Sequence, residues 1–282
     1  KLHPLLLGCG EIGSRNEGGK DHGSARYVSV KLNKKIYDVM FKKEDNILLE
    51  YIDSEGSYIE PRFFLPVMPL AIMENYKTTA HGWKIEVWGR DIIKVKEAMG
   101  MLLNNKTPTR ELPINPNISL TKLITVTTNG DNRIIYSKGE YKIINTNGRI
   151  DMHITELPIG IWPVKYIQHI SESCKDMIDP NIDISNTSTN DVVNILIPLI
   201  EDWESKVPKI NDGVFTDIEI AFGLRVRLCD ELNFISPEGG VITFDRYIDF
   251  LIYWFNIRKQ FYILRIDRQI EILKNKILEA KN

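Results

Sequence analysis

A glycine-rich stretch that ends in an arginine and a tyrosine is the segment of this chain best suited to chemistry. Residues 10–27 contain five glycines among eighteen residues, together with Arg15, Lys20, Arg26 and Tyr27. Because glycine costs roughly 1 kcal/mol in a helix interior, the stretch predicts a shaped loop rather than a helix or a strand. Without side chains at those positions, the backbone of such a loop can approach a partner closely.

Arg26 and Tyr27 form a candidate nucleophile with electrostatic support beside it. A phenol has a reference pKa of about 10 and is a poor nucleophile while it is protonated. An adjacent guanidinium favours the phenolate, and its planar set of donors also holds a phosphate oxygen. The dipeptide therefore suggests attack on phosphorus and a phosphotyrosyl ester, although most Arg-Tyr pairs are an exposed charge beside a half-buried ring.

The order of residues in the loop resembles the active-site loop of type IIA DNA topoisomerases. From Gly10 to Tyr27 the matching residues read Gly-x-Ile-Gly-Ser-Arg-x-x-Gly-Gly-Lys-Asp-x-x-Ser-x-Arg-Tyr. The Gly-Gly-Lys-Asp portion favours the eukaryotic single-chain enzyme over a bacterial-type topoisomerase whose A chain works with a separate partner chain. The resemblance implies that Tyr27 is the nucleophile, that Arg26 supports the scissile phosphate, and that Arg15 and Lys20 face DNA.

Downstream, His81-Gly82-Trp83 resembles the Thr-Gly-Trp of the same family. Counting back from it, Thr79 stands where the family has an isoleucine that wedges between base steps and bends the DNA. Threonine is smaller and polar, so either the bend is made differently or Tyr76, the nearest large side chain, serves as the wedge. Thr79 and Tyr76 are therefore the further DNA-binding candidates.

The resemblance implies an α+β fold in three parts. Residues 1–65 would be the end of a winged-helix domain with the tyrosine loop, residues 66–236 a β-rich tower domain, and residues 237–282 the first helix of a coiled-coil arm. The tower match rests on the sequence Ile-Thr-Glu-Leu-Pro-Ile at 154–159. The arm match rests on Phe255, Arg258, Tyr262 and Arg265.

The same resemblance implies a homodimer that cuts double-stranded DNA through a 5′-phosphotyrosyl link, passes another duplex and reseals the break. It implies Mg²⁺ and ATP as cofactors of the complete enzyme, both bound outside this segment, and it assigns no metal ligand here. The chain begins with Lys1 and has no initiator methionine, so we interpret it as a piece of a larger protein. A non-catalytic DNA-binding or dimerisation scaffold, in which the Arg-Tyr pair is inert, is the main alternative.

Charge and composition fit a nucleic-acid partner only locally. The net charge is −2, yet residues 15–43 carry eight Lys or Arg against three Asp or Glu, enough for a phosphate-facing patch. The three cysteines lie far apart, which is typical of free thiols in a reducing compartment. We expect an intracellular protein, in the host cytoplasm if it comes from a large DNA virus and in the nucleus otherwise. No apolar run approaches eighteen residues, so no membrane partner is expected.

The hydrophobic pattern predicts several elements that would position these residues. Asp91 is the expected N-cap of a helix over 91–103 that ends at Asn104-Asn105. Residues 118–158 predict β-structure with turns at 128–131 and 145–148. The other predictions are a helix over 30–41, strands over 46–52, 192–200 and 218–228, a loop over 176–190, and a long helix over 241–282, where Gly and Pro are absent.

Overall fold

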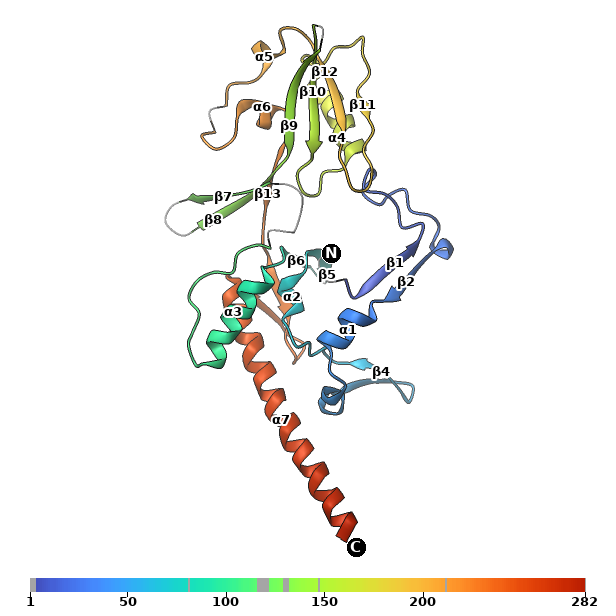
Figure 1. Ribbon diagram of the computed structural model, residues 1–282, viewed down its shortest axis with the longest axis vertical. Coiled ribbons are helices and arrows are strands. Elements are labelled where there is room, and N and C mark those ends of the chain that lie inside the picture. Colours follow the sequence, from blue (N-terminus) through green and yellow to red (C-terminus); the bar gives the residue numbers. More distant parts are fainter. Residues whose placement is uncertain are drawn as a thin grey trace. The chain divides into compact units, whose positions relative to one another are not determined.

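Figure 1 shows the computed structural model, which describes residues 4–80, 82–115, 122–128, 132–146, 148–210 and 212–281. The chain divides into two compact units, and each is assembled from separate segments. We name them the arm unit, residues 1–7, 32–118 and 230–282, and the loop unit, residues 8–31 and 119–229. Helices and strands are mixed in both, in agreement with the predicted mixture.

Two antiparallel sheets frame the loop unit. The first has the order β11-β12-β10-β9 and consists of β9 (Glu140–Thr146), β10 (Arg149–Glu156), β11 (Ser185–Asn186) and β12 (Ile195–Leu199). The second has the order β13-β8-β7 and consists of β7 (Lys122–Thr128), β8 (Asn132–Lys138) and β13 (Arg225–Leu228). Separately, β1 (Leu6–Gly10) pairs with β2 (Val28–Leu32), and the 3₁₀ turn η1 (Ala25–Tyr27) leads directly into β2.

The core of the loop unit lies between the first sheet and the helix α4 (Pro163–Ser173). Met152 and Ile154, which are alternate residues of β10, pack in one fully buried cluster with Ile170 of α4. Two short helices, α5 (Trp203–Lys206) and α6 (Asp217–Ala221), complete this unit. Burial of apolar area contributes about 25 cal/mol per Å² to the stability of the fold. This cluster therefore holds in place the end of β10 and the start of α4, which lie near the glycine-rich loop.

The prediction of β-structure over 118–158 is confirmed for the residues that the structure describes, whereas residues 129–131 and 147 of the two turns lie outside them. The strand predicted over 218–228 is wrong in its first half, where α6 forms instead. Thr216 and Glu219 make a reciprocal capping box there, which satisfies backbone donors at a helix start and outweighs the alternating pattern. The strand over 192–200 is confirmed as β12.

The arm unit surrounds the start of a long helix, α7 (Tyr247–Lys281). Its helical elements are α1 (Lys34–Met40), η2 (Lys43–Leu48), α2 (Leu70–Met73) and α3 (Ile92–Leu103). Its strands form three hairpin pairs, β3 (Tyr51–Ser54) with β4 (Ser57–Pro61), β5 (Tyr76–Ala80) with β6 (Trp83–Val87), and β14 (Leu232–Ile235) with β15 (Val241–Phe244). Val95 of α3 and Leu251 of α7 share its fully buried core.

The helix predicted over 91–103 is confirmed, and the side chain of Asp91 accepts a hydrogen bond from the Ile93 amide as its N-cap. The helix predicted over 30–41 begins later, at Lys34, because residues 28–32 pair with β1. The strand over 46–52 is wrong for residues 46–48, which belong to η2. The long helix begins at Tyr247, since residues 241–244 pair with β14.

A buried ion cluster attaches α7 to η2. Nη2 of Arg258 lies 2.8 Å from Oδ2 of Asp45, and Nη1 of Arg265 lies 3.2 Å from Oδ1 of the same carboxylate. Both guanidinium groups also lie over the ring of Tyr262, at 4.1 and 4.8 Å from its centroid. Arg258 is only 2% exposed, so its charge depends on Asp45 for compensation. Arg258, Tyr262 and Arg265 are three of the four residues on which the coiled-coil resemblance rests, and all three belong to this cluster.

We expect Asp45→Ala to lower the free energy of unfolding by about 3–5 kcal/mol, because it leaves the Arg258 charge buried without a partner. Chemical denaturation followed by circular dichroism measures the change. Asp267→Ala is the matched control, since Asp267 is an exposed carboxylate on α7, the helix that carries Arg258. Equal stability of the two variants would contradict the assigned role of the cluster.

Candidate active site on the glycine-rich loop

The glycines of the loop adopt backbone conformations that other residues rarely take. Gly10 has a φ of +84°, and a Cβ added there would lie 2.1 Å from the carbonyl oxygen of Tyr27. That oxygen accepts a hydrogen bond from the Glu11 amide at 3.3 Å. The start and the end of the loop are therefore closed on each other, in a geometry that requires glycine.

A salt bridge ties the loop to the first sheet of the loop unit. Nη2 of Arg15 contacts Oε1 of Glu156, which stands at the end of β10 and is only 4% exposed. The same carboxylate oxygen accepts the Leu157 amide at 2.9 Å, and the Arg15 amide donates to Oδ1 of Asn190 at 2.8 Å. Charge-assisted hydrogen bonds of this kind are about twice as strong as neutral ones.

The middle of the loop is docked on the first turn of α4. The Val164 amide donates to the carbonyl oxygen of Asn16 at 3.2 Å, and Nδ2 of Asn186 donates to the Asn16 side chain at 3.0 Å. Gly18 lies against the indole of Trp162, where a Cβ would come within 2.3 Å of Cδ1. The loop is thus fixed by the end of β10, the start of α4, and the side chains of Asn186 and Asn190.

One acidic residue of the loop, Asp21, fixes the loop's own backbone. Oδ1 of Asp21 accepts a hydrogen bond from the Ser14 amide at 2.8 Å. Hydrogen bonds from the Ser14 side chain and backbone lower the pKa of Asp21 below its usual value. The carboxylate therefore stays ionised and holds the turn at neutral pH.

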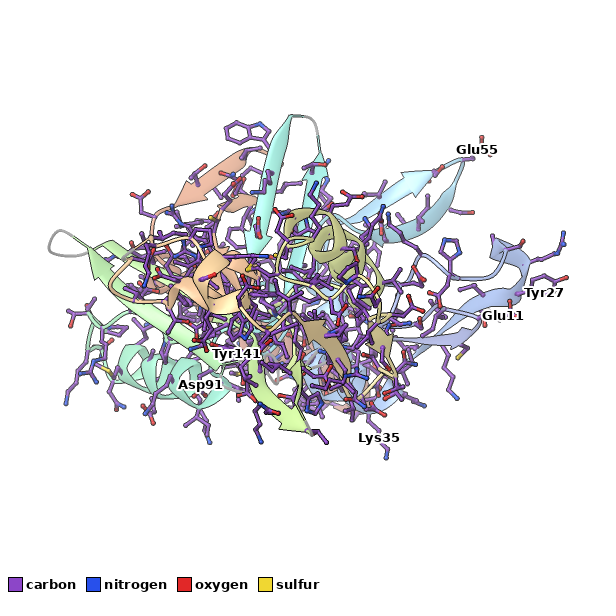
Figure 2. The ribbon with its side chains drawn as sticks, turned by 90° about the horizontal axis from the view of Figure 1, so that it is seen from above. Glu11, Tyr27, Lys35, Glu55, Asp91 and Tyr141 are labelled. Carbon is purple, nitrogen blue, oxygen red and sulfur yellow. The ribbon has the colours of Figure 1, made fainter. Side chains whose placement is uncertain are left out.

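Tyr27 is presented outward at the end of this loop, as Figure 2 shows. Its side chain is 55% exposed, and among the described residues its hydroxyl has no hydrogen-bond partner. The guanidinium carbon of Arg26 lies 5.0 Å from the centroid of its ring, and Arg26 is exposed as well. A free phenol and an adjacent cation are therefore available on one surface, and a phosphate group can approach both.

The sequence-predicted residues fall into the two units. Arg15, Lys20, Arg26 and Tyr27 lie together on the loop unit, where Lys20 is exposed and Arg15 is engaged by Glu156. Thr79 and Tyr76 belong to the arm unit. The roles predicted for all six residues stay predictions.

The two wedge candidates differ in their surroundings. Thr79 is exposed on β5 and paired with Lys84 of β6. Tyr76 packs against the core of the arm unit and donates a hydrogen bond to the carbonyl oxygen of Ala71 at 2.7 Å. Burial raises the pKa of Tyr76 well above its usual value. Its hydroxyl is thus held inside the fold, whereas Thr79 is free to meet a partner.

The sequence did not point to the residues that hold the loop, which are Glu156, Trp162, Asn186 and Asn190. Glu156 and Trp162 lie in or beside the segment that resembles a tower strand, yet nothing in their spacing linked them to a loop more than 130 residues earlier. Within the described residues, no group of three His, Cys, Asp or Glu is arranged to hold a metal ion. None of the helices that the structure describes is both long and apolar enough to cross a membrane.

We expect Glu156→Ala to release the loop, because the half-buried guanidinium of Arg15 loses its anionic partner. The loss of charge-assisted hydrogen bonds should lower the free energy of unfolding by about 1–3 kcal/mol. Amide hydrogen exchange over residues 14–20 should rise at the same time. Glu140→Ala, which removes an exposed carboxylate on the adjacent strand, should leave exchange in these residues unchanged. Loop protection that survives in Glu156→Ala would show that the salt bridge does not hold the loop.

A second prediction separates backbone strain from the contact with Trp162. Gly18 and Gly19 both have positive φ, 64° and 79°, so alanine costs about 1 kcal/mol at either position. Only at Gly18 does the added Cβ meet an indole ring, whereas at Gly19 the nearest atom is 3.9 Å away. Gly18→Ala should therefore raise loop exchange and alter Trp162 fluorescence more than Gly19→Ala does. Identical behaviour of the two variants would argue against docking on Trp162.

Comparison with known proteins identifies the family of this chain. The chain matches the family of DNA gyrase/topoisomerase IV A subunits over residues 2–281. It is 33% identical over 290 residues to DNA topoisomerase 2 of African swine fever virus (isolate Pig/Kenya/KEN-50/1950), covering 98% of this chain and 24% of the viral protein. It is 25% identical over 266 residues to DNA topoisomerase 2-alpha of Rattus norvegicus, covering 93% of this chain and 16% of the rat protein.

The fold is similar to a crystal structure of the Plasmodium falciparum topoisomerase II DNA-binding, cleavage and re-ligation domain. The TM-score is 0.77 at 21% identity, with 96% of this chain and 35% of the other covered. The chain spans about a quarter of the length of the viral relative. The predicted resemblance is confirmed, and identity is higher to the viral enzyme than to the rat enzyme. This chain belongs to the family of DNA gyrase/topoisomerase IV A subunits.

Proposed function

We propose that this chain is the DNA-binding and cleavage segment of an ATP-dependent type II DNA topoisomerase, with Tyr27 as its nucleophile. The observation that carries the proposal is the exposed Tyr27 hydroxyl, which has no hydrogen-bond partner among the described residues. Tyr27 lies beside Arg26 on a loop that the salt bridge between Arg15 and Glu156 holds in place. The function named for the Plasmodium relative, DNA binding, cleavage and re-ligation, supports the same interpretation.

The chemistry is phosphoryl transfer without hydrolysis. The phenolic oxygen of Tyr27 attacks a backbone phosphorus in line, a tyrosyl–phosphorus ester forms, and the bond from phosphorus to the 3′ oxygen breaks. The phenol gives up one proton and the leaving 3′ oxygen takes one up, so the step is balanced and the ester energy is kept. Arg26 stabilises negative charge on the phosphate oxygens by electrostatic attraction and hydrogen bonding. The reverse attack by the 3′ hydroxyl reseals the strand.

Magnesium and ATP belong to the proposed complete enzyme. The described residues do not fit a magnesium site, since no cluster of three potential ligands occurs among them. The work of this segment is therefore to present the nucleophile, to bind the duplex and to hold the reacting phosphate. Thr79, exposed on β5, is the better placed of the two wedge candidates in this scheme.

The proposed enzyme is a homodimer, and the division into winged-helix end, tower and coiled-coil arm belongs to the same proposal. Support for the arm comes from the second half of α7. Beyond Arg265 this helix exposes a row of apolar residues, Ile266, Ile270, Leu273 and Ile277. Such a row at helical spacing is suited to packing against another helix.

We expect Tyr27→Phe in the full-length protein to abolish DNA cleavage while DNA affinity stays within about tenfold, because only the nucleophilic oxygen is lost. The assay traps protein covalently bound to duplexes labelled at the 5′ or the 3′ end. Tyr58→Phe, at another highly exposed tyrosine, is the control and should cleave normally. Cleavage that persists in Tyr27→Phe would show that Tyr27 is not the nucleophile, whereas an absence of cleavage in the unmodified protein would leave the non-catalytic scaffold as the better interpretation.

A further inference from the structure

Lys20 of the loop and Lys165 of α4 lie beside each other on the surface of the loop unit. The two segments are joined at that point, since the Val164 amide donates to Asn16 and Gly18 packs on Trp162. Both lysines are exposed. The contact with the Lys20 side chain, followed by repulsion between the two ammonium groups, lowers the pKa of Lys165 below its usual value.

This placement of two cations is unfavourable in the absence of an anion. Neither lysine makes a salt bridge with any Asp or Glu among the described residues, and the first turn of α4 contains no acid. Lys165 also stands in that first turn, where the helix dipole disfavours a positive charge. Elsewhere in the same unit, Arg15 and Arg225 each have a carboxylate partner.

The helix terminus itself is not the site, because its Val164 amide is already bonded to the loop. What remains free is a pair of ammonium groups, each with three donors. An anion with several oxygens, placed between them, turns their repulsion into attraction. A phosphodiester group has the size and the charge for this role, and lysine binds phosphate as a point charge.

We propose that Lys20 and Lys165 together hold a single phosphate of the DNA backbone. The proposal rests on the proposed function for the nature of the partner, and it adds Lys165 and the sharing of one phosphate. Lys20 lies seven residues before Tyr27 on the same loop, so a strand bound at the pair is engaged by the element that carries the nucleophile. The contact reads no base and therefore positions the strand without selecting its sequence.

The test measures how DNA affinity depends on salt, with the full-length protein and a fluorescently labelled duplex in the absence of divalent cations. Each phosphate contact contributes about 0.9 to the slope of log K against log salt concentration. Lys20→Ala and Lys165→Ala should each weaken DNA binding but change the slope by much less than one, because the remaining lysine still neutralises the shared phosphate. The double variant should lose about one. Lys175→Ala, an exposed lysine just beyond the other end of α4, is the control and should leave the slope unchanged.

Two results would overturn the proposal. An unchanged DNA affinity in Lys165→Ala means that this residue does not contact DNA. A loss of about two in the double variant means that the lysines contact separate phosphates, since independent contacts add and a shared one does not. The readout is binding without cleavage, so either result leaves the detection of a covalent adduct at Tyr27 as a separate measurement.

A second arm distinguishes backbone phosphate from free phosphate. After reductive methylation of the lysines with labelled formaldehyde, the signal of Lys165, assigned by its loss in Lys165→Ala, is followed by NMR. The duplex should shift this signal at concentrations where inorganic phosphate does not. Equal response to inorganic phosphate would make the pair a site for free phosphate and overturn the assignment to DNA.

Discussion

The salt bridge between Arg15 and Glu156 ties the glycine-rich loop to the sheet of the loop unit. A loop with this density of glycine has a large conformational entropy when it is free, and ordering each residue costs about 1–2 kcal/mol. The contacts of Asn16 with Val164 and Asn186, and of Gly18 with Trp162, offset that cost together with the salt bridge. Because the loop is held from one side, Tyr27 can remain exposed and still be positioned.

The charges on this loop and on the strand end that holds it are divided between two tasks. The carboxylates of Asp21 and Glu156 hold the loop, one through the Ser14 amide and the other through Arg15. Arg26 and Lys20 lie exposed on the same loop and are left to meet an anionic partner. This division explains how a chain with a net charge of −2 can still present a local cationic surface.

In the arm unit, a buried charge cluster performs a comparable anchoring task. Asp45 receives Arg258 and Arg265, and Tyr262 lies against both guanidinium groups. Taking such charges out of water costs several kcal/mol per ion, so the cluster contributes more to a defined attachment of α7 than to net stability. Past this cluster, the apolar side chains of α7 are exposed to solvent.

Local sequence determined the elements whose signals are short-range. The glycine density predicted the loop, Asp91 marked the start of α3, and the alternating pattern predicted β9 and β10. The local sequence also contains the capping box of Thr216 and Glu219 that starts α6, and the strand prediction overlooked it. In each case the deciding interaction lies within a few residues, so composition and spacing are enough to express it.

Tertiary structure alone decided which residues hold these elements in place. Arg15 meets Glu156 across 141 residues of sequence, and Asp45 meets Arg258 across 213. Residues 241–244, Val-Ile-Thr-Phe, are of types that favour strands, and they pair with β14. The long-helix prediction rested on the absence of Gly and Pro and overlooked this local preference. Periodicity reports which side of an element is buried and not what covers it, so the partners of Arg15 and Asp45 were fixed only when the sheets and helices packed together.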